Sequence, residues 1–254
     1  MSFNVKGILS IYLVLILFSS ITFSDILWED NFDDYHEGMP LECSKNWERF
    51  RLYWGEGAFT IMGNGNKYAF YLLGHPPFDG GDIYIASGGS SYADMEVSAQ
   101  VMVCSYMMDG PAEGGVFTRV SGEEDIFSGY GAIYYEWYNH PPDYPSKYKI
   151  GIYYLIGSDL ITLTEVESDE RPFDGAIIRI KATGENPVLI SAWFGDVNIT
   201  YEDYIYLKEN GFGGIYAYYY ECAFSAVDVD NFVETGETSI IEPTSIGTLR
   251  AIFR

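Results

Sequence analysis

Apolar and polar residues alternate along most of the chain after its first 24 residues, a pattern typical of half-buried β-strands. The clearest run is Ala93–Met107. Its small and apolar positions share one face of a strand: Val97, Ala99, Val101 and Val103. Glu96, Ser98 and Gln100 share the opposite face. No long segment has the 3.6-residue apolar spacing of a helix, so we expect helices to be few and short.

Turn signals separate the remaining strand patterns about every ten residues. We expect these further strands at 116–120, 129–138, 147–157, 159–166, 175–184, 187–196 and 213–227. A Gly-Ser-Asp turn at 157–159 joins two of them into a hairpin. The Gly-rich and acidic stretches 109–115 and 121–125 are interpreted as turns. The spacing predicts an all-β domain, either a sandwich or a barrel.

The first 24 residues have the layout of a secretory signal peptide. Lys6 precedes an apolar run at 8–18, and a small and polar stretch follows at 19–24. The apolar run is shorter than the roughly 20 residues that a membrane span needs, although an uncleaved N-terminal anchor stays open as the alternative. We therefore expect residues 1–24 to be removed, and a mature chain without a membrane span that is secreted, periplasmic or on the cell surface.

The composition changes again near the C-terminus. Residues 25–234 carry the strand pattern and are predicted to form one domain. Residues 235–254 begin with Thr, Ser, Gly and Pro and end in a short apolar stretch with Arg250 and Arg254. We expect a linker and a short C-terminal tail there, which is either a disordered end or a docking or sorting element.

Composition narrows the classes of partner. Aromatic residues make up 17% of the chain, and 23 Tyr with 27 Gly favour pleated surfaces joined by tight turns. The formal net charge of −23 argues against nucleic acid or an anionic membrane as a partner. Such acidity fits a soluble surface protein or one that holds divalent cations. Cys43, Cys104 and Cys222 form no CxxC pair, and any disulfide pairing among them stays open.

The order of motifs resembles a known fold family. In chain order, the motifs are DNFDD at 30–34, Trp47, the GxGxF start at 55–59, GGVFTR at 114–119, GYGAIYY at 129–135 and DNF at 230–232. Over about Asp25 to Val233 they resemble the concanavalin A-like jelly rolls of the laminin-G-like type in secreted bacterial proteins. They are similar to domains of the 3-keto-disaccharide hydrolase-like group and to the accessory sandwich of exo-inulinases. The resemblance implies a two-sheet antiparallel jelly-roll sandwich, with the first and last strands adjacent in one sheet.

Glycoside hydrolysis is one chemistry to consider, because members of this fold perform it with carboxylates that alternate along one strand. Glu165, Glu167 and Asp169 alternate in this way. Their order differs from that of laminarinase-like enzymes, and the run leads into a charged stretch that favours a solvated turn. The chain has no GxSxG, HExxH or phosphate-loop motif. A glycoside hydrolase is therefore the alternative function, with no catalytic residue assigned.

Carbohydrate binding is the favoured function, since it needs only aromatic platforms flanked by a few polar groups. In the strand at 129–138, Tyr135 and Trp137 share one face, and Tyr216, Tyr218 and Tyr220 share a face of a later strand. The resemblance places the Arg of GGVFTR on the concave sheet, where it meets a glycan or pairs with an acid such as Glu136. The ligand-binding set that we predict on the concave sheet is Arg119, Tyr130, Tyr134, Glu136 and Tyr138. Packing in the core is the alternative for the tyrosines.

The acidic motifs at the two ends of the domain suggest a metal ion. If the first and last strands pair, Asp30 and Asp230 come close together, and a carbonyl near Gly57 completes the oxygen ligands of a structural calcium ion. The alternative is two polar strand edges whose carboxylates accept hydrogen bonds from turn amides.

The prediction is thus a secreted, non-catalytic module with a glycan or cell-surface polysaccharide as its partner. A surface-display protein anchored or sorted by its tail is a further alternative. The oligomeric state is not indicated by the sequence.

Overall fold

The protein is described by a computed structural model, in which residues 26–236 form one compact unit. The described residues are 25–51, 57–63, 67–73, 80–89, 91–105, 111–123, 126–137, 147–168, 176–206, 210–219 and 225–236. The predicted signal peptide and residues 237–254 lie outside them. Among the described residues, no helix has the length and apolar character that crossing a membrane requires.

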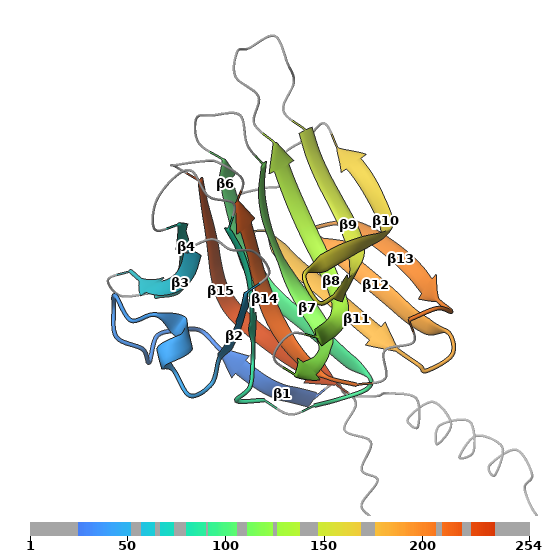
Figure 1. Cartoon of the computed structure of the whole chain (residues 1–254), viewed down its shortest axis with the longest axis horizontal. Helices are drawn as coiled ribbons and strands as arrows, with labels where there is room; N and C mark the ends of the chain where they lie inside the picture. The colour runs from blue at the N-terminus through green and yellow to red at the C-terminus, as the bar shows by residue number, and fades with distance from the viewer. Residues whose placement is uncertain are drawn as a thin grey trace, which may run out of the picture. The chain divides into compact units, whose positions relative to one another are not determined.

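One sheet has eight strands among the described residues, in the order β13–β12–β11–β6–β15–β4–β3, and β1 pairs with β15 beside this path (Figure 1). The bounds are β1 Asp25–Asp30, β3 Gly57–Met62, β4 Tyr68–Leu73, β6 Met95–Ser105, β11 Ile177–Thr183, β12 Val188–Phe194, β13 Val197–Asp203 and β15 Ser225–Gly236. Strands distant in sequence thus become neighbours, such as β6 and β15, which pair antiparallel.

The other sheet has seven strands among the described residues, in the order β10–β9–β8–β7–β14–β5–β2. The bounds are β2 Glu48–Arg51, β5 Gly80–Ile85, β7 Pro111–Glu123, β8 Ile126–Trp137, β9 Lys147–Ile156, β10 Asp159–Ser168 and β14 Phe212–Tyr219. The described helical structure is one 3₁₀ turn, η1 at Leu41–Cys43. The predicted all-β, two-sheet antiparallel jelly roll is confirmed.

The core lies between the two sheets and follows from the alternation in the sequence. In β6 the predicted apolar face is buried, because Val97, Ala99, Val101 and Val103 are at most 4% exposed. The same period of two sends Ile150, Ile152 and Tyr154 of β9 into this core from the other sheet. Apolar burial between the sheets is the main stabilising contribution to such a fold.

Two strands extend into stretches that the sequence suggests are turns. The hairpin of β9 and β10 is confirmed, with Ile156 opposite Asp159. However, β10 continues to Ser168, so Glu165 and Glu167 lie on a strand and not in a solvated turn. Likewise, β7 begins at Pro111, and Glu113 lies within the strand. Both corrections place carboxylates on the same sheet.

The two Asp-Asn-Phe motifs lie together, because β1 pairs with β15 as predicted. Phe32 and Phe232 are both fully buried. Their rings contact Trp47, at centroid distances of 5.9 and 5.0 Å. Phe32 and Asn231 have left-handed backbone angles, with φ of 61° and 50°. Phe32 follows the end of β1, and Asn231 lies at an irregularity in the register of β15 with β6. The repeated motif therefore serves to pack two phenylalanines on one tryptophan.

Candidate functional site

The surface of the seven-stranded sheet that faces away from the core, here called the outer face, carries rows of tyrosines and charged residues. Residues that alternate with them on the same strands enter the core, as Ala112, Ala132, Ile152 and Ala217 do. Strand register aligns the outward residues across six strands. The first row is Gly81, Tyr218, Glu113, Tyr135, Lys149 and Glu167, and the second row is Ile83, Tyr216, Gly115, Ile133, Gly151 and Glu165.

Beside these rows, the outer face has an apolar floor of its own. Its fully or mostly buried members are Ile83, Ile85, Phe117, Val120, Phe127, Ile133, Leu155 and Tyr216. The ring of Phe117 lies over Gly131 on the neighbouring strand, where a Cβ atom would come within 2.5 Å of the ring. Glycine at 131 therefore lets an aromatic ring lie flat on the sheet, which builds an apolar surface without closing it.

Glu113 is the central acid of the first row. The Tyr216 hydroxyl donates a 2.8 Å hydrogen bond to its Oε2 atom. The residue as a whole is half-buried, but protein atoms surround its carboxyl group, and this burial raises the pKa of Glu113 to about 7. Burial, together with the charge of Glu113, also raises the pKa of Tyr135 to about 12. Near neutral pH this carboxyl can therefore change its protonation state.

Glu165 in the second row has different surroundings. Lys149 Nζ lies 2.8 Å from its Oε1 atom, and the Tyr153 hydroxyl donates a 2.9 Å hydrogen bond to Oε2. Burial works to raise the pKa of Glu165, but the bonds from Lys149 and Tyr153 outweigh it and lower this pKa below its usual value. Lys149 also lies 3.6 Å from Glu167 and 5.8 Å from the ring centroid of Tyr135. The outer face thus holds one ionised acid, Glu165 on β10, and one that burial keeps partly protonated, Glu113 on β7.

The predicted ligand-binding tyrosines lie on the opposite face. Tyr130, Tyr134 and Glu136 are at most 5% exposed, and both tyrosines belong to the core between the sheets. The Tyr130 hydroxyl donates a 2.5 Å hydrogen bond to Asp203, and that of Tyr134 donates one of 3.4 Å to Glu136. The face assignment within β8 is therefore corrected, since the packing alternative holds for these tyrosines. Tyr138 lies outside the described residues.

Arg119 also lies in the interior, fully buried, and not on an outward surface. Its guanidinium pairs with Asp94 at 3.3 Å, instead of with Glu136, and donates to the carbonyl oxygens of Ala93 and Gly184. Burial lowers the pKa of Arg119. Its backbone is left-handed, with a φ of 54°, at an irregularity in the register of β7. Arg119 therefore links β7 to the segments before β6 and after β11.

The predicted calcium ligands are not assembled into one shell. Asp30 accepts hydrogen bonds from the Phe32 amide at 2.8 Å, the Tyr35 hydroxyl at 2.5 Å and the Trp47 indole at 2.9 Å. The Gly57 carbonyl accepts a hydrogen bond from the Arg49 guanidinium, whose positive charge opposes a cation at that oxygen. Among the described residues, no three acidic, His or Cys side chains are grouped so that they could hold a metal ion.

The acidic ends themselves agree with the alternative interpretation, that of carboxylates bonded to turn amides. Asp30 accepts from the Phe32 amide, and Asp230 accepts from the Asn231 amide at 2.7 Å. Between these motifs lies the β1–β15 cavity, of about 470 Å³. It is lined by Glu29, Asp30, Asn31, Asp34, Tyr35, Asn46, Asn231, Phe232 and Val233.

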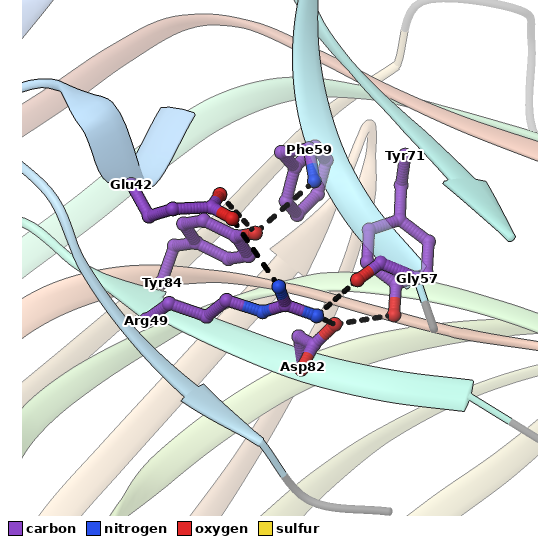
Figure 2. A network of polar contacts seen from close by, with 7 residues as sticks. All are labelled: Glu42, Arg49, Gly57, Phe59, Tyr71, Asp82 and Tyr84. Carbon is purple, nitrogen blue, oxygen red and sulfur yellow. Dashed lines mark hydrogen bonds and ion pairs between the residues drawn. The ribbon is translucent and has the colours of Figure 1, made fainter. Parts of the chain in front are cut away.

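A buried polar network beside η1 was not indicated by any sequence pattern (Figure 2). Arg49 Nη2 lies 2.9 Å from Asp82 Oδ2, and the Tyr71 hydroxyl donates a 2.6 Å hydrogen bond to the same oxygen. Burial raises the pKa of Asp82, although Arg49 and Tyr71 act in the opposite direction. Asp82 is only 1% exposed, so no ligand reaches it.

Tyr84 extends this network. Its hydroxyl donates to Glu42 at 2.9 Å and accepts from the amide of Phe59 at 3.2 Å. Figure 2 shows Tyr84 and Glu42 on one side of Arg49, with Asp82 and Tyr71 on the other. The network joins η1, β2, β3, β4 and β5, and we interpret it as structural.

Of the three cysteines, the structure describes the side chain of Cys43. Cys43 is exposed, with a free thiol. The side chain of Cys104 and all of Cys222 lie outside the described residues.

Comparison with known proteins agrees with the fold. The sequence matches no protein-family model and none of the curated proteins. The structure is similar to the mixed-linkage glucan GH16 protein of Bacteroides ovatus, solved with its G4G4G3G product, at a TM-score of 0.51 and 12% identity over 83% of this chain and 100% of that one. A galectin-like protein of unknown function from Bacillus subtilis also has a TM-score of 0.51, at 10% identity over 85% of this chain and 100% of that one.

A third similar structure is the CBM2 module of the evolved Dit protein of Lactobacillus casei BL23 phage J-1. Its TM-score is 0.50, at 11% identity over 84% of this chain and 96% of that one. At these identities the likeness shows the fold alone, which is the concanavalin A-like jelly roll that the sequence motifs resemble.

Proposed function

We propose that the protein is a secreted, non-catalytic module that binds a carbohydrate on the outer face of its seven-stranded sheet. One observation carries this proposal. The first row presents Tyr218, Glu113, Tyr135 and Lys149 on four consecutive strands, away from the core. A sugar chain offers apolar ring faces and many hydroxyl groups, and these rows offer tyrosine rings with carboxylate and ammonium groups beside them.

The comparisons support the same class of ligand. Two of the similar structures are described as a glucan GH16 protein bound to its product and as a CBM2 module. Because the identities are 11–12%, these names suggest a ligand class and no particular sugar.

A glycoside hydrolase is the second candidate, since one partly protonated acid, Glu113, and one ionised acid, Glu165, lie on the same face. Two strands, β8 and β9, separate them, which places their Cα atoms about 14 Å apart. Glu113 also bonds to Tyr216 on β14, on the side away from Glu165. Catalytic carboxyl pairs are about 5–10 Å apart, measured between the carboxyl groups. Besides burial, the charge of Glu165 contributes to the raised pKa of Glu113, so the two carboxyl groups interact and hydrolysis stays the second candidate.

The test of binding is a panel of soluble oligosaccharides titrated against the folded protein. We expect Tyr135→Ala to weaken binding of whichever oligosaccharide is retained by about tenfold, because it removes a central ring of the first row. Tyr204→Ala is the matched control, since Tyr204 is 60% exposed and lies after β13, in the other sheet. Equal affinities for Tyr135→Ala and the wild type would contradict binding on the outer face. Cleaved sugar in the mixture would show that the protein is a hydrolase.

Secretion and calcium are tested separately. Expression of the full chain with a functional export system is expected to yield an exported protein whose first residue lies near 25; retention of residues 1–24 would support the anchor instead. A calcium ion in the β1–β15 cavity would raise the melting temperature on addition of calcium and lower it with a chelator. An unchanged melting temperature in both conditions would contradict a bound calcium ion.

A further inference from the structure

Glu113 has an unusual position on the outer face, between two tyrosines. In the strand register it lies directly opposite Tyr135 on β8 and Tyr218 on β14, and residues opposite each other on adjacent strands are in side-chain contact range. Tyr216, one row away on β14, donates its hydroxyl hydrogen bond to the carboxyl group. The carboxyl therefore lies among three tyrosines from the two adjacent strands.

The charges around Glu113 leave it without a positive partner in the described part of the chain. Its described hydrogen bond comes from the neutral Tyr216 hydroxyl. Lys149 is the cation of the same row, but it is held by Glu165 at 2.8 Å and by Glu167 at 3.6 Å. The two rows together contain three carboxyl groups, of Glu113, Glu165 and Glu167, and one ammonium group, of Lys149. This surface therefore repels anionic ligands and attracts a positive charge.

A carboxylate flanked by aromatic rings suits an ammonium group, because the ring faces attract a cation while the carboxylate accepts its hydrogen bonds. The outer face already contains one such arrangement, in which the Lys149 ammonium lies near the Tyr135 ring and Glu165. Tyr135 thus separates an occupied ammonium position from the position at Glu113.

We propose, resting on the carbohydrate-binding function above, that Glu113 with Tyr135 and Tyr218 receives the ammonium group of an unacetylated amino sugar in the bound glycan. Two tyrosines on either side of Glu113 in the first row suit a chain of sugar rings, and the excess of carboxyl groups on this face disfavours uronate and sulfated sugars. The other outward groups near Glu113 are Tyr216 on β14, Lys149 and Tyr153 on β9, and Glu165 and Glu167 on β10.

The pH dependence follows from this arrangement. With a pKa near 7 in the free protein, Glu113 is largely protonated in mild acid and must ionise to bind an ammonium group. Affinity for the amino sugar is therefore expected to rise about tenfold from about pH 5.5 to about pH 7 and to fall again in mild base, where the sugar's own ammonium group loses its proton, while affinity for a neutral oligosaccharide stays nearly constant.

The experiment is calorimetric titration of the full mature protein with oligomers of glucosamine, N-acetylglucosamine and glucose of equal length. We expect the glucosamine oligomer to bind at least about tenfold more tightly than the acetylated one at neutral pH. Glu113→Gln, which keeps an acceptor for Tyr216, should abolish this preference. Glu165→Gln is the matched control and should retain it, because Lys149 and Glu167 remain.

The outcomes separate the two proposals. Binding of neutral oligomers without an amine preference, or a preference that persists in Glu113→Gln, overturns the amino-sugar inference and leaves the carbohydrate function standing. Absence of binding to every oligomer in the wider panel overturns both. A melting temperature of Glu113→Gln at or above that of the wild type verifies that the variant is folded.

Discussion

Tyr134 and Tyr135 are consecutive in β8, yet they lie on opposite faces of the seven-stranded sheet. Tyr134 is 5% exposed, and its ring stacks on Tyr148 at a centroid distance of 6.3 Å. Tyr135 is half-buried and lies between Glu113 and Lys149 in the first row. Tyrosine–carboxyl hydrogen bonds occur on both faces, so residue type does not distinguish core from binding face. The two faces are distinguished instead by their access to solvent and by the presence of a charged group without an oppositely charged partner.

Two carboxyl groups, Glu113 and Glu234, show the same contrast between outer face and interior. Burial raises the pKa of each to about 7. Glu234 is fully buried in the sandwich, where its Oε1 atom accepts a 2.8 Å hydrogen bond from the Gly213 amide. Its Oε2 atom has no hydrogen-bond partner among the described residues. Glu113 lies on the outer face, where a ligand can supply the missing charge. Both raised pKa values couple stability to pH, but only at Glu113 can a ligand reach the carboxyl group from solvent.

The largest expected effect belongs to the interior. Arg119→Ala should lower the free energy of unfolding by about 3–5 kcal/mol, because it removes a fully buried side chain and leaves the Ala93 and Gly184 carbonyls without their donor. Denaturant unfolding measures this change. Arg179→Ala is the control on the other sheet, where the half-exposed guanidinium stacks on Trp193 at 4.3 Å; we expect about 1 kcal/mol or less. Similar losses for the two variants would contradict the interior role of Arg119.

Glu234 gives the second effect, through pH. A folded-state pKa raised from 4.5 to about 7 means that stability is fully present below pH 4.5 and is lost as pH rises through 7. From about pH 4 to about pH 8 the wild type should lose about 2–3 kcal/mol through this group. Glu234→Gln should remove that component, as measured by unfolding at both pH values. An identical pH dependence in wild type and variant would show that Glu234 has the same pKa in the folded and the unfolded protein, so that burial does not raise it.

The smallest effect on stability is expected at the edge of the outer face. Glu165→Gln removes a partly exposed ion pair with Lys149, so the free energy of unfolding should fall by no more than about 1 kcal/mol. Its effect on glycan affinity should be about two- to threefold, far below that of Tyr135→Ala, since Lys149 keeps Glu167 as a partner. Calorimetry and thermal melts measure both. Loss of all binding in Glu165→Gln would move the centre of the site from Glu113 to β10.

The sequence predicted strand positions well where only one face of a strand is apolar. In β6, Val97 and Val101 alternate with polar residues, so the core face is unambiguous. In β8 both faces carry aromatic residues, and alternation alone does not say which face is the core. Gly131 was the available signal, since its lack of a Cβ marks the face where Phe117 lies flat on the sheet.

Glu113 was missed for a related reason. The stretch around it contains Gly110, Pro111, Gly114 and Gly115, which is typical of a turn. In the folded protein two of these glycines are needed for close packing within β7, because a Cβ at Gly114 would meet Val103 and one at Gly115 would meet the Ala132 carbonyl. Long-range packing of this kind is not encoded in local turn propensity. The pairing of β1 with β15, by contrast, followed from the repeated motif and its resemblance to a known fold.

In the proposed complex the ligand contacts the outer face, and not the interior or the other sheet. Nuclear magnetic resonance titration of the labelled protein with a bound oligosaccharide tests it most directly, because each backbone amide reports its own surroundings. We expect the largest shift changes at Glu113, Tyr135 and Tyr218, with little change at Trp193 on the eight-stranded sheet. Changes concentrated around Trp193, or around the β1–β15 cavity at Asn31 and Asn231, would contradict binding on the outer face.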